Sequence, residues 1–248
     1  MASWTLAIVF AFLFQPATGF LGDTGLRSIE AWRRTCVASV KHDCFTRSKR
    51  RTPSQVAAKG VGGLRSAFEV EVGRQLEVGS VLVAGSDNYG HMTYKAVALI
   101  YEHGEGGPTR AVCVDKGLDF TIGEMSSGDL GPLSNNRLFR GGEDGGEVAI
   151  MIHSHDIEGA RPLGDTGLFV GGFVSALDLV DEQRAEPGDF KFFFNHLAWP
   201  AGALKEQVEK GLWKVVGLPN EVLLETKRMR DMELWGRIEF ALKNKVQR

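Results

Sequence analysis

Short apolar runs, many of them rich in β-branched residues, alternate with polar and glycine-rich stretches through the last two thirds of the chain. A run of this kind bounded by turn residues is typical of a β-strand. The pattern predicts strands at residues 80–84, 96–101, 111–114, 148–152, 168–172, 189–194 and 213–216. The connections between the first three are too short for a crossover helix, which predicts antiparallel pairing.

Apolar residues at helical spacing indicate three helices. They cover residues 173–180, a short amphipathic stretch at 201–210 that stops at Gly211, and a longer tail at 221–242. The polar, glycine-rich residues 117–136 predict an exposed loop with one short helical turn at most.

Strands and short helices interleave without a regular strand–helix–strand period, and this predicts the α+β class. We expect a largely antiparallel or mixed β-sheet flanked by short helices, with a barrel-like closure of the sheet as one option. A single domain over residues 68–248 contains all of these elements.

The start of the chain carries an unbroken apolar run, LAIVFAFLF, at residues 6–14. A run of this length is too short to cross a bilayer, which takes roughly 20 residues, but it suits the core of a signal peptide. Ala17 and Gly19 supply the small residues of a cleavage site. We therefore expect residues 1–19 to be a signal peptide that is cut before Phe20.

Residues 20–67 form a basic leader and linker whose content of Arg, Lys, Ser and Thr is typical of a transit peptide. A signal peptide followed by a transit peptide, with Phe20 directly after the cut, resembles the bipartite presequence of algae with secondary red plastids. The resemblance implies a plastid protein, in the stroma or peripherally at the thylakoid surface. Secretion or retention in the endomembrane lumen is the alternative.

The charge of the domain limits its classes of partner, and its cysteine content limits its class of fold. Residues 1–53 hold eight Lys and Arg against three Asp and Glu, whereas residues 54–248 hold 21 against 28. An acidic domain repels phosphate backbones, so we expect no nucleic-acid partner. Cys36 and Cys44 lie in the leader, which leaves Cys113 alone in the domain and argues against a disulfide scaffold.

A series of short motifs across residues 79–242 resembles the AlgH/YqgE-like family in both order and spacing. In chain order the motifs are Val81–Ala84, Leu99–His103 with Gly104, Gly141-Gly142, Phe169–Gly172, Phe192–Phe194, Trp199, Gly202, Leu204, Val208, Gly211, Trp213 and Leu234-Trp235. The resemblance implies an α+β domain for which no enzymatic activity is established.

Several polar positions depart from the pattern of that family. Val114–Lys116 stands where the family usually has Asn-Arg-Pro, and Glu143 replaces the proline of Gly-Gly-Pro. Asn195–Trp199 stands in place of Gly-Tyr-x-Gly-Trp, and Ala203–Gln207 in place of the acidic Gln-Leu-Glu-x-Glu. A ligand site built from the family's own polar groups would therefore be altered in this chain.

The densest group of potential metal ligands is His153-Ser154-His155-Asp156. On an extended segment His153 and His155 project to the same side. A His-x-His pair with a carboxylate can bind zinc or iron when other segments add ligands. A metal-assisted enzyme built on His153, His155 and Asp156 is therefore one hypothesis, and a merely polar strand end is the other interpretation.

Further candidate ligand-binding residues flank glycine turns or a tryptophan, where loops often carry function. They are Glu102, His103, Gly141, Gly142, Gly171, Gly172, His196 and Trp199. Backbone N–H groups after Gly171-Gly172 could face an anion, although these glycines also suit a tight turn. No Gly-x-Ser-x-Gly, HExxH or CxxC motif is present, and the sequence requires no cofactor.

These observations favour a non-catalytic module that binds a small molecule or a protein partner. The metal-assisted enzyme is the alternative from another class. A thylakoid-associated photosynthesis or assembly factor is a third hypothesis.

Replacing Phe20 with Ala tests the predicted address. A fluorescent fusion of the full chain should then accumulate outside the plastid, because the residue exposed by signal cleavage would no longer match the plastid presequence. Fluorescence microscopy of the fusion measures this, with Phe45→Ala, deeper in the leader, as the matched control. Import of both variants to the same extent would contradict a role for Phe20.

Overall fold

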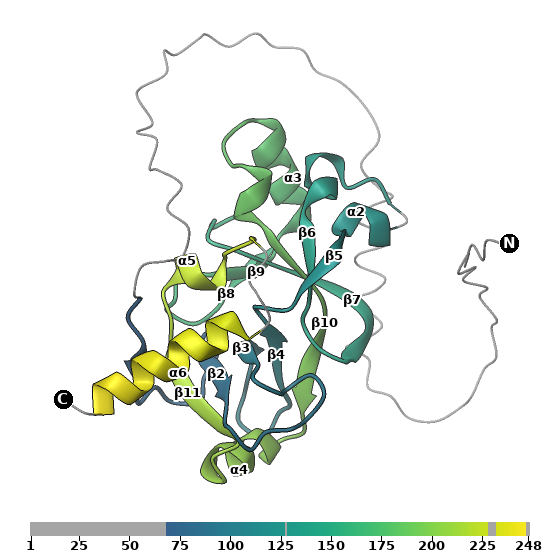
Figure 1. The fold of residues 1–248 in the computed structure, drawn as a ribbon. Coiled ribbons are helices and arrows are strands. Elements are labelled where there is room, and N and C mark those ends of the chain that lie inside the picture. Colours follow the sequence, from purple (N-terminus) through teal and green to yellow (C-terminus); the bar gives the residue numbers. More distant parts are fainter. Residues whose placement is uncertain (1–67, 127, 228–231, 247–248) are drawn as a thin grey trace, which may run out of the picture. The chain divides into compact units, whose positions relative to one another are not determined.

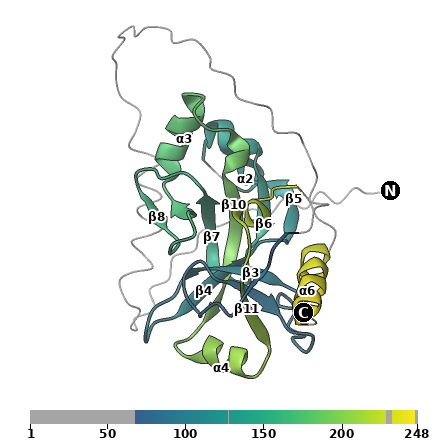
Figure 2. The same cartoon turned by 90° about the vertical axis from the view of Figure 1, so that its left-hand side faces the viewer.

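The computed structural model describes residues 68–126, 128–227 and 232–246 (Figure 1). The predicted signal peptide and leader at residues 1–67 lie outside the described residues. The described part folds as an α+β domain in which strands form one large sheet and short helices flank it (Figures 1 and 2).

Strands outnumber helices in the described part of the chain. The strands are β1 (Glu71–Val72), β2 (Val81–Ala84), β3 (Val97–Glu102), β4 (Thr109–Cys113), β5 (Gly117–Thr121), β6 (Arg137–Arg140), β7 (Asp144–His153), β8 (Ala160–Pro162), β9 (Phe169–Gly171), β10 (Lys191–Trp199) and β11 (Trp213–Gly217). The helices are α2 (Ile122–Met125), α3 (Phe173–Asp181), α4 (Ala203–Glu209), α5 (Asn220–Leu223) and α6 (Glu233–Val246), with 3-10 turns η1 (Gly131–Asn135) and η2 (Pro187–Asp189).

The sheet has the order β1-β11-β2-β3-β4-β10-β7-β9-β8, with β6 and β5 branching from β10. The predicted antiparallel pairing of β2, β3 and β4 is confirmed. Among the described strands, β6 and β10 make the one parallel pair. The path runs from β1 at one edge to β8 at the other without closing, so the barrel-like option is wrong.

β10 is the strand at which the sheet branches. Its first half, Phe192–Phe194, pairs with both β6 and β7, and its second half, Leu197–Trp199, pairs with β4. Gly141 lies at the divide, where its N–H donates to the carbonyl of Phe194 and its own carbonyl accepts from the N–H of Cys113, each at 2.8 Å. The strands β4 and β6 therefore occupy the same side of β10 one after the other.

Three predictions from the sequence are wrong in extent. Residues 117–136 contain β5, α2 and η1 as well as loop, because β5 pairs with β6. The strand predicted at 189–194 continues to Trp199, because its second half pairs with β4. The predicted tail helix at 221–242 is divided into α5 and α6, with Leu224–Lys227 outside both helices.

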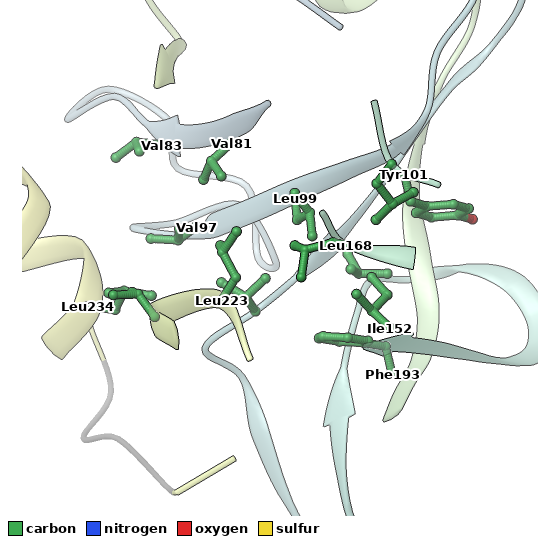
Figure 3. Close-up of a cluster of buried hydrophobic side chains, with 14 of the residues drawn as sticks. Val81, Val83, Val97, Leu99, Tyr101, Ile152, Leu168, Phe193, Leu223 and Leu234 are labelled. Carbon is green, nitrogen blue, oxygen red and sulfur yellow. The ribbon is translucent and has the colours of Figure 1, made fainter. Parts of the chain in front are cut away.

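Alternate residues of the central strands face two separate cores, as the period of a strand requires. Val97 and Leu99 of β3 face one side with Leu223 and Leu234 from the α5–α6 region (Figure 3). Ala98 and its alternating neighbours face the other side, toward α4. Because the strands are covered on both faces, they read as continuous apolar runs in the sequence.

Three tryptophans of the described part of the chain connect α4 and α6 to the sheet. Trp199 and Trp213 pack edge to face with ring centroids 5.8 Å apart, and both indole N–H groups donate to Gln207 Oε1 of α4 at 3.0 Å. Trp235 of α6 donates its indole N–H to the carbonyl of Ala84 at 2.7 Å. In Figures 1 and 2, α3 and α4 lie at opposite ends of the sheet.

Lys191 is a fully buried lysine at the start of β10, with 1 % of its surface exposed. Its ammonium donates to the carbonyl oxygens of Val114 and Leu223 at 2.8 and 2.9 Å and lies over the Phe139 ring. Burial lowers the pKa of Lys191 to about 7, while the carboxylate of Asp115 works in the opposite direction. Lys191 therefore ties the end of α5 to the β4–β5 connection.

Substituting Lys191 with Met should change how stability depends on pH. The pKa of Lys191 is about 7 when folded against an ordinary 10.5, so the unfolded chain holds more protons between these values. Stability of the wild type relative to Lys191→Met should therefore rise with pH through this window, by at most about 1.4 kcal/mol per pH unit. Urea unfolding at about pH 7 and about pH 10 measures the difference.

Lys205→Met is the matched control, because Lys205 is an exposed residue of α4. Its stability should follow the pH dependence of the wild type. Parallel pH profiles for Lys191→Met and wild type would show that burial does not perturb the lysine.

Candidate functional site

Two irregular places in the sheet bring Tyr101 and His196 together. The register of β3 against β4 shifts just before Glu102, which makes Tyr101 an extra residue in β3. The register of β10 against β7 shifts at Asn195, whose φ of 60° is left-handed. The rings of Tyr101 and His196 then meet edge to face with centroids 5.9 Å apart. Such irregularities re-aim side chains and are frequent next to functional sites.

Charged side chains lie close to this ring pair in the structure. Arg110 Nη1 of β4 donates to both carboxylate oxygens of Glu102 at 2.7 and 2.9 Å, and both side chains are 39 % exposed. Arg161 of β8 donates from Nη2 to the carbonyl oxygen of Tyr101 at 3.0 Å. We call Tyr101, Glu102, Arg110, Arg161 and His196 the Tyr101–His196 site.

His196 is nearly buried, and its Nδ1 has no hydrogen-bond partner among the described residues. Burial lowers the pKa of His196, and the positive charge of Arg110 lowers it further, while Asp144 and Glu102 oppose the shift. The ring is therefore neutral at neutral pH. Gly145 covers Nδ1 so closely that a Cβ there would lie 2.9 Å from it.

The hydroxyl of Tyr101 stays protonated at any physiological pH. Burial raises the pKa of Tyr101 well above its ordinary value, and Glu102 raises it further. Arg110 and Arg161 both lower that pKa, so both guanidinium groups act on the same hydroxyl. The site thus presents a neutral phenol and a neutral imidazole beside two guanidinium groups and the carboxylates of Glu102 and Asp144.

The structure brings three of the predicted binding residues, Glu102, His103 and His196, into one region. His103 follows β3, and its Nδ1 lies 2.7 Å from Thr109 Oγ1 across the hairpin. Trp199 lies elsewhere, because its ring is buried in the core beside Trp213.

Gly141 and Gly142 lie against the backbone of Asn195 and His196, where a Cβ on either glycine would collide with main-chain atoms. Their role in the described structure is close passage of two chain segments. This passage sets the position of the backbone that carries His196.

Gly171 and Gly172 form the turn from β9 into α3, with φ of 94° and 72°. A Cβ on Gly172 would crowd Ala160 and the carbonyl of Glu158, at 3.0 and 3.1 Å. Backbone conformation therefore explains both residues, and the Gly171 carbonyl is used by His153.

The His153 and His155 rings stack with centroids 6.3 Å apart, so they do lie on one side of the chain. Both ring nitrogens of the buried His153 are engaged: Nε2 lies 2.9 Å from the Gly171 carbonyl, and Nδ1 accepts from the N–H of His155. Nε2 must therefore carry the proton. Burial, followed by the neighbouring His155, lowers the pKa of His153.

His155 Nε2 pairs with Asp189 Oδ2 at 3.2 Å, while Asp156 is exposed. Within residues 68–126, 128–227 and 232–246, no three His, Cys, Asp or Glu side chains are grouped so that they could hold a metal ion. The geometry thus uses His153 as an internal hydrogen-bonding group and does not favour it as a ligand.

Sequence reasoning missed Tyr101, Arg110 and Arg161 as members of the site. The Glu102–Arg110 pair could have been found from the short β3–β4 hairpin, in which the two residues face each other. Arg161 is 60 residues from Tyr101 in the chain, and no local pattern indicates their contact.

In the described part of the chain, none of the helices has the length and apolar character needed to cross a bilayer.

Comparison with known proteins shows which family the domain resembles. The pattern of the AlgH-like family matches residues 81–245. A UPF0301 protein of Chlorobaculum parvum is 26% identical over 168 residues, covering 65% of this chain and 84% of the relative. A UPF0301 protein of Chlamydia muridarum is 27% identical over 170 residues, with 65% and 84% covered.

Two solved structures share the fold. A crystal structure of a Corynebacterium diphtheriae protein superposes with a TM-score of 0.56 at 18% identity, covering 66% of this chain and 86% of that one. The solution structure of AlgH from Pseudomonas aeruginosa gives 0.50 at 12% identity, with 67% and 87% covered. Since the family pattern spans most of the described domain, this chain belongs to the AlgH-like family.

Proposed function

We propose that the chain is a plastid-targeted, non-catalytic binding module of the AlgH-like family that holds a small ligand at the Tyr101–His196 site. The observation that carries the proposal is the unpartnered, buried Nδ1 of His196 beside Tyr101 and Arg110. An unsatisfied buried polar atom costs about 1–3 kcal/mol, so natural structures rarely retain one without a reason. A ligand that repositions the Gly145 segment would give this atom a partner.

The state of each group favours binding over catalysis. Tyr101 keeps its proton, because burial raises the pKa of its hydroxyl. Both carboxylate oxygens of Glu102 accept from Arg110, so the carboxylate is already engaged in an ion pair. Cys113 is buried, and burial raises the pKa of its thiol to about 12, so it offers no nucleophile. What remains is a set of hydrogen-bonding groups in fixed positions.

The plastid address rests on the N-terminal sequence. The apolar run at residues 6–14, the small residues before Phe20 and the basic leader support it. A plastid location implies that the ligand is a molecule of the plastid.

Recovery of a bound small molecule tests the binding function. The tagged full chain is purified from its own cells under native conditions and examined by native mass spectrometry. We expect a retained small molecule whose occupancy falls about tenfold in the double variant Glu102→Gln, Arg110→Gln, since a contact to a charged group contributes about 1.5–3 kcal/mol. Neutralising both partners avoids leaving one charge unpaired.

The matched control is Glu206→Gln, Lys210→Gln, which removes an exposed ion pair of α4. It should retain the molecule as the wild type does. Wild-type protein that carries no small molecule, and that shows no change in the spectra of Tyr101 or His196 when a plastid metabolite extract is added, would contradict the proposal.

A further inference from the structure

We infer that the Tyr101–His196 site takes a small anion, a carboxylate or a phosphate group, bound between Arg161 and Arg110. The inference rests on the proposed function, because it names the class of ligand for the same site. It is carried by the guanidinium groups of Arg161 and Arg110, which contact the neighbouring residues Tyr101 and Glu102.

The two arginines differ in their partners. Glu102 pairs with Arg110, whereas Arg161 forms no ion pair among the described residues. The guanidinium of Arg161 makes one hydrogen bond there, from Nη2 to the carbonyl oxygen of Tyr101. Only Nη1 of Arg110 is used by Glu102, so its Nε and Nη2 make no hydrogen bond within the described part of the chain. Free guanidinium donors at two positions suit the planar carboxylate or the phosphate oxygens.

The charge of the domain limits the size of the anion. Residues 54–248 hold 21 Lys and Arg against 28 Asp and Glu, so an extended phosphate backbone would be repelled. The unused guanidinium donors of Arg110 and of the exposed Arg161 suit a small anion instead. A compact, singly or doubly charged ligand is the class that fits.

His196 adds a pH dependence to the site. The groups that face it are Arg110 from β4, Glu102 and Tyr101 from β3, and Asp144 from β7. In the free protein, burial and Arg110 keep the ring neutral. A bound anion adds negative charge beside the ring and favours the imidazolium form, so binding takes up a proton. Affinity for the anion should consequently increase as the pH falls.

Titration of the full chain with sodium sulfate and with sodium acetate tests the inference, at constant ionic strength set by sodium chloride. Sulfate stands in for phosphate because its charge does not change over the pH range used. We expect either probe to shift the NMR signals of Tyr101 and His196, with affinity higher at about pH 5.5 than at about pH 7.5. A response to sulfate alone assigns a phosphate ligand, and a response to acetate alone assigns a carboxylate.

Arg161→Gln should weaken the responding probe about tenfold, the order expected for a charge-assisted hydrogen bond. The matched control is Arg74→Gln, because Arg74 pairs with Glu71 of β1 at the opposite edge of the sheet. The control should bind the probe as the wild type does. Equal affinity in Arg161→Gln and wild type would overturn the inference.

The two proposals fail in different ways. If a neutral molecule from the plastid extract occupies the site and neither anion competes with it, the anion inference is wrong and the binding function stands. If neither anion nor extract perturbs Tyr101 or His196, the binding function itself is wrong.

Discussion

The close passage of Gly141 and Gly142 against the backbone of β10 is the constraint on which the rest of this structure depends. At that point β4 and β6 separate along one side of β10, and Gly141, directly after β6, hydrogen-bonds to Phe194 of β10 and to Cys113 of β4. A side chain at either glycine would strike the main chain of Asn195 or His196. The two halves of the sheet can share β10 only because this space is empty of Cβ atoms.

The same passage creates the candidate site. β10 meets the glycines where its chain takes a left-handed turn at Asn195, and β7 leaves register with it there. His196 is thereby set against Tyr101, the extra residue of β3, and cut off from water on its Nδ1 side by Gly145. A polar ring in such a place is costly unless a partner arrives. The site is therefore a consequence of how the sheet branches.

The sequence predicted what is local and missed what is not. The strand Val81–Ala84 and the antiparallel β3–β4 hairpin were predicted correctly, because a run of apolar residues and a short connection are local features of the sequence. The partition of β10 between β4 and β6, and the contact of Arg161 with Tyr101, depend on pairs far apart in the chain. Of the candidate site, Glu102 was predicted from its place before a glycine loop and His196 from its place near Trp199, whereas Tyr101, Arg110 and Arg161 were not predicted.

The departure from the family pattern at residues 195–199 has a physical meaning. The sequence resemblance implies Gly-Tyr-x-Gly-Trp where this chain has Asn195–Trp199. Asn195 has a φ of 60°, which glycine adopts freely and asparagine tolerates better than most other residues. Asn195 thus meets the backbone requirement, and the ring set beside Tyr101 is the imidazole of His196. An imidazole can take up a proton near neutral pH, whereas a phenol cannot, so the pH-linked binding inferred for this site depends on His196.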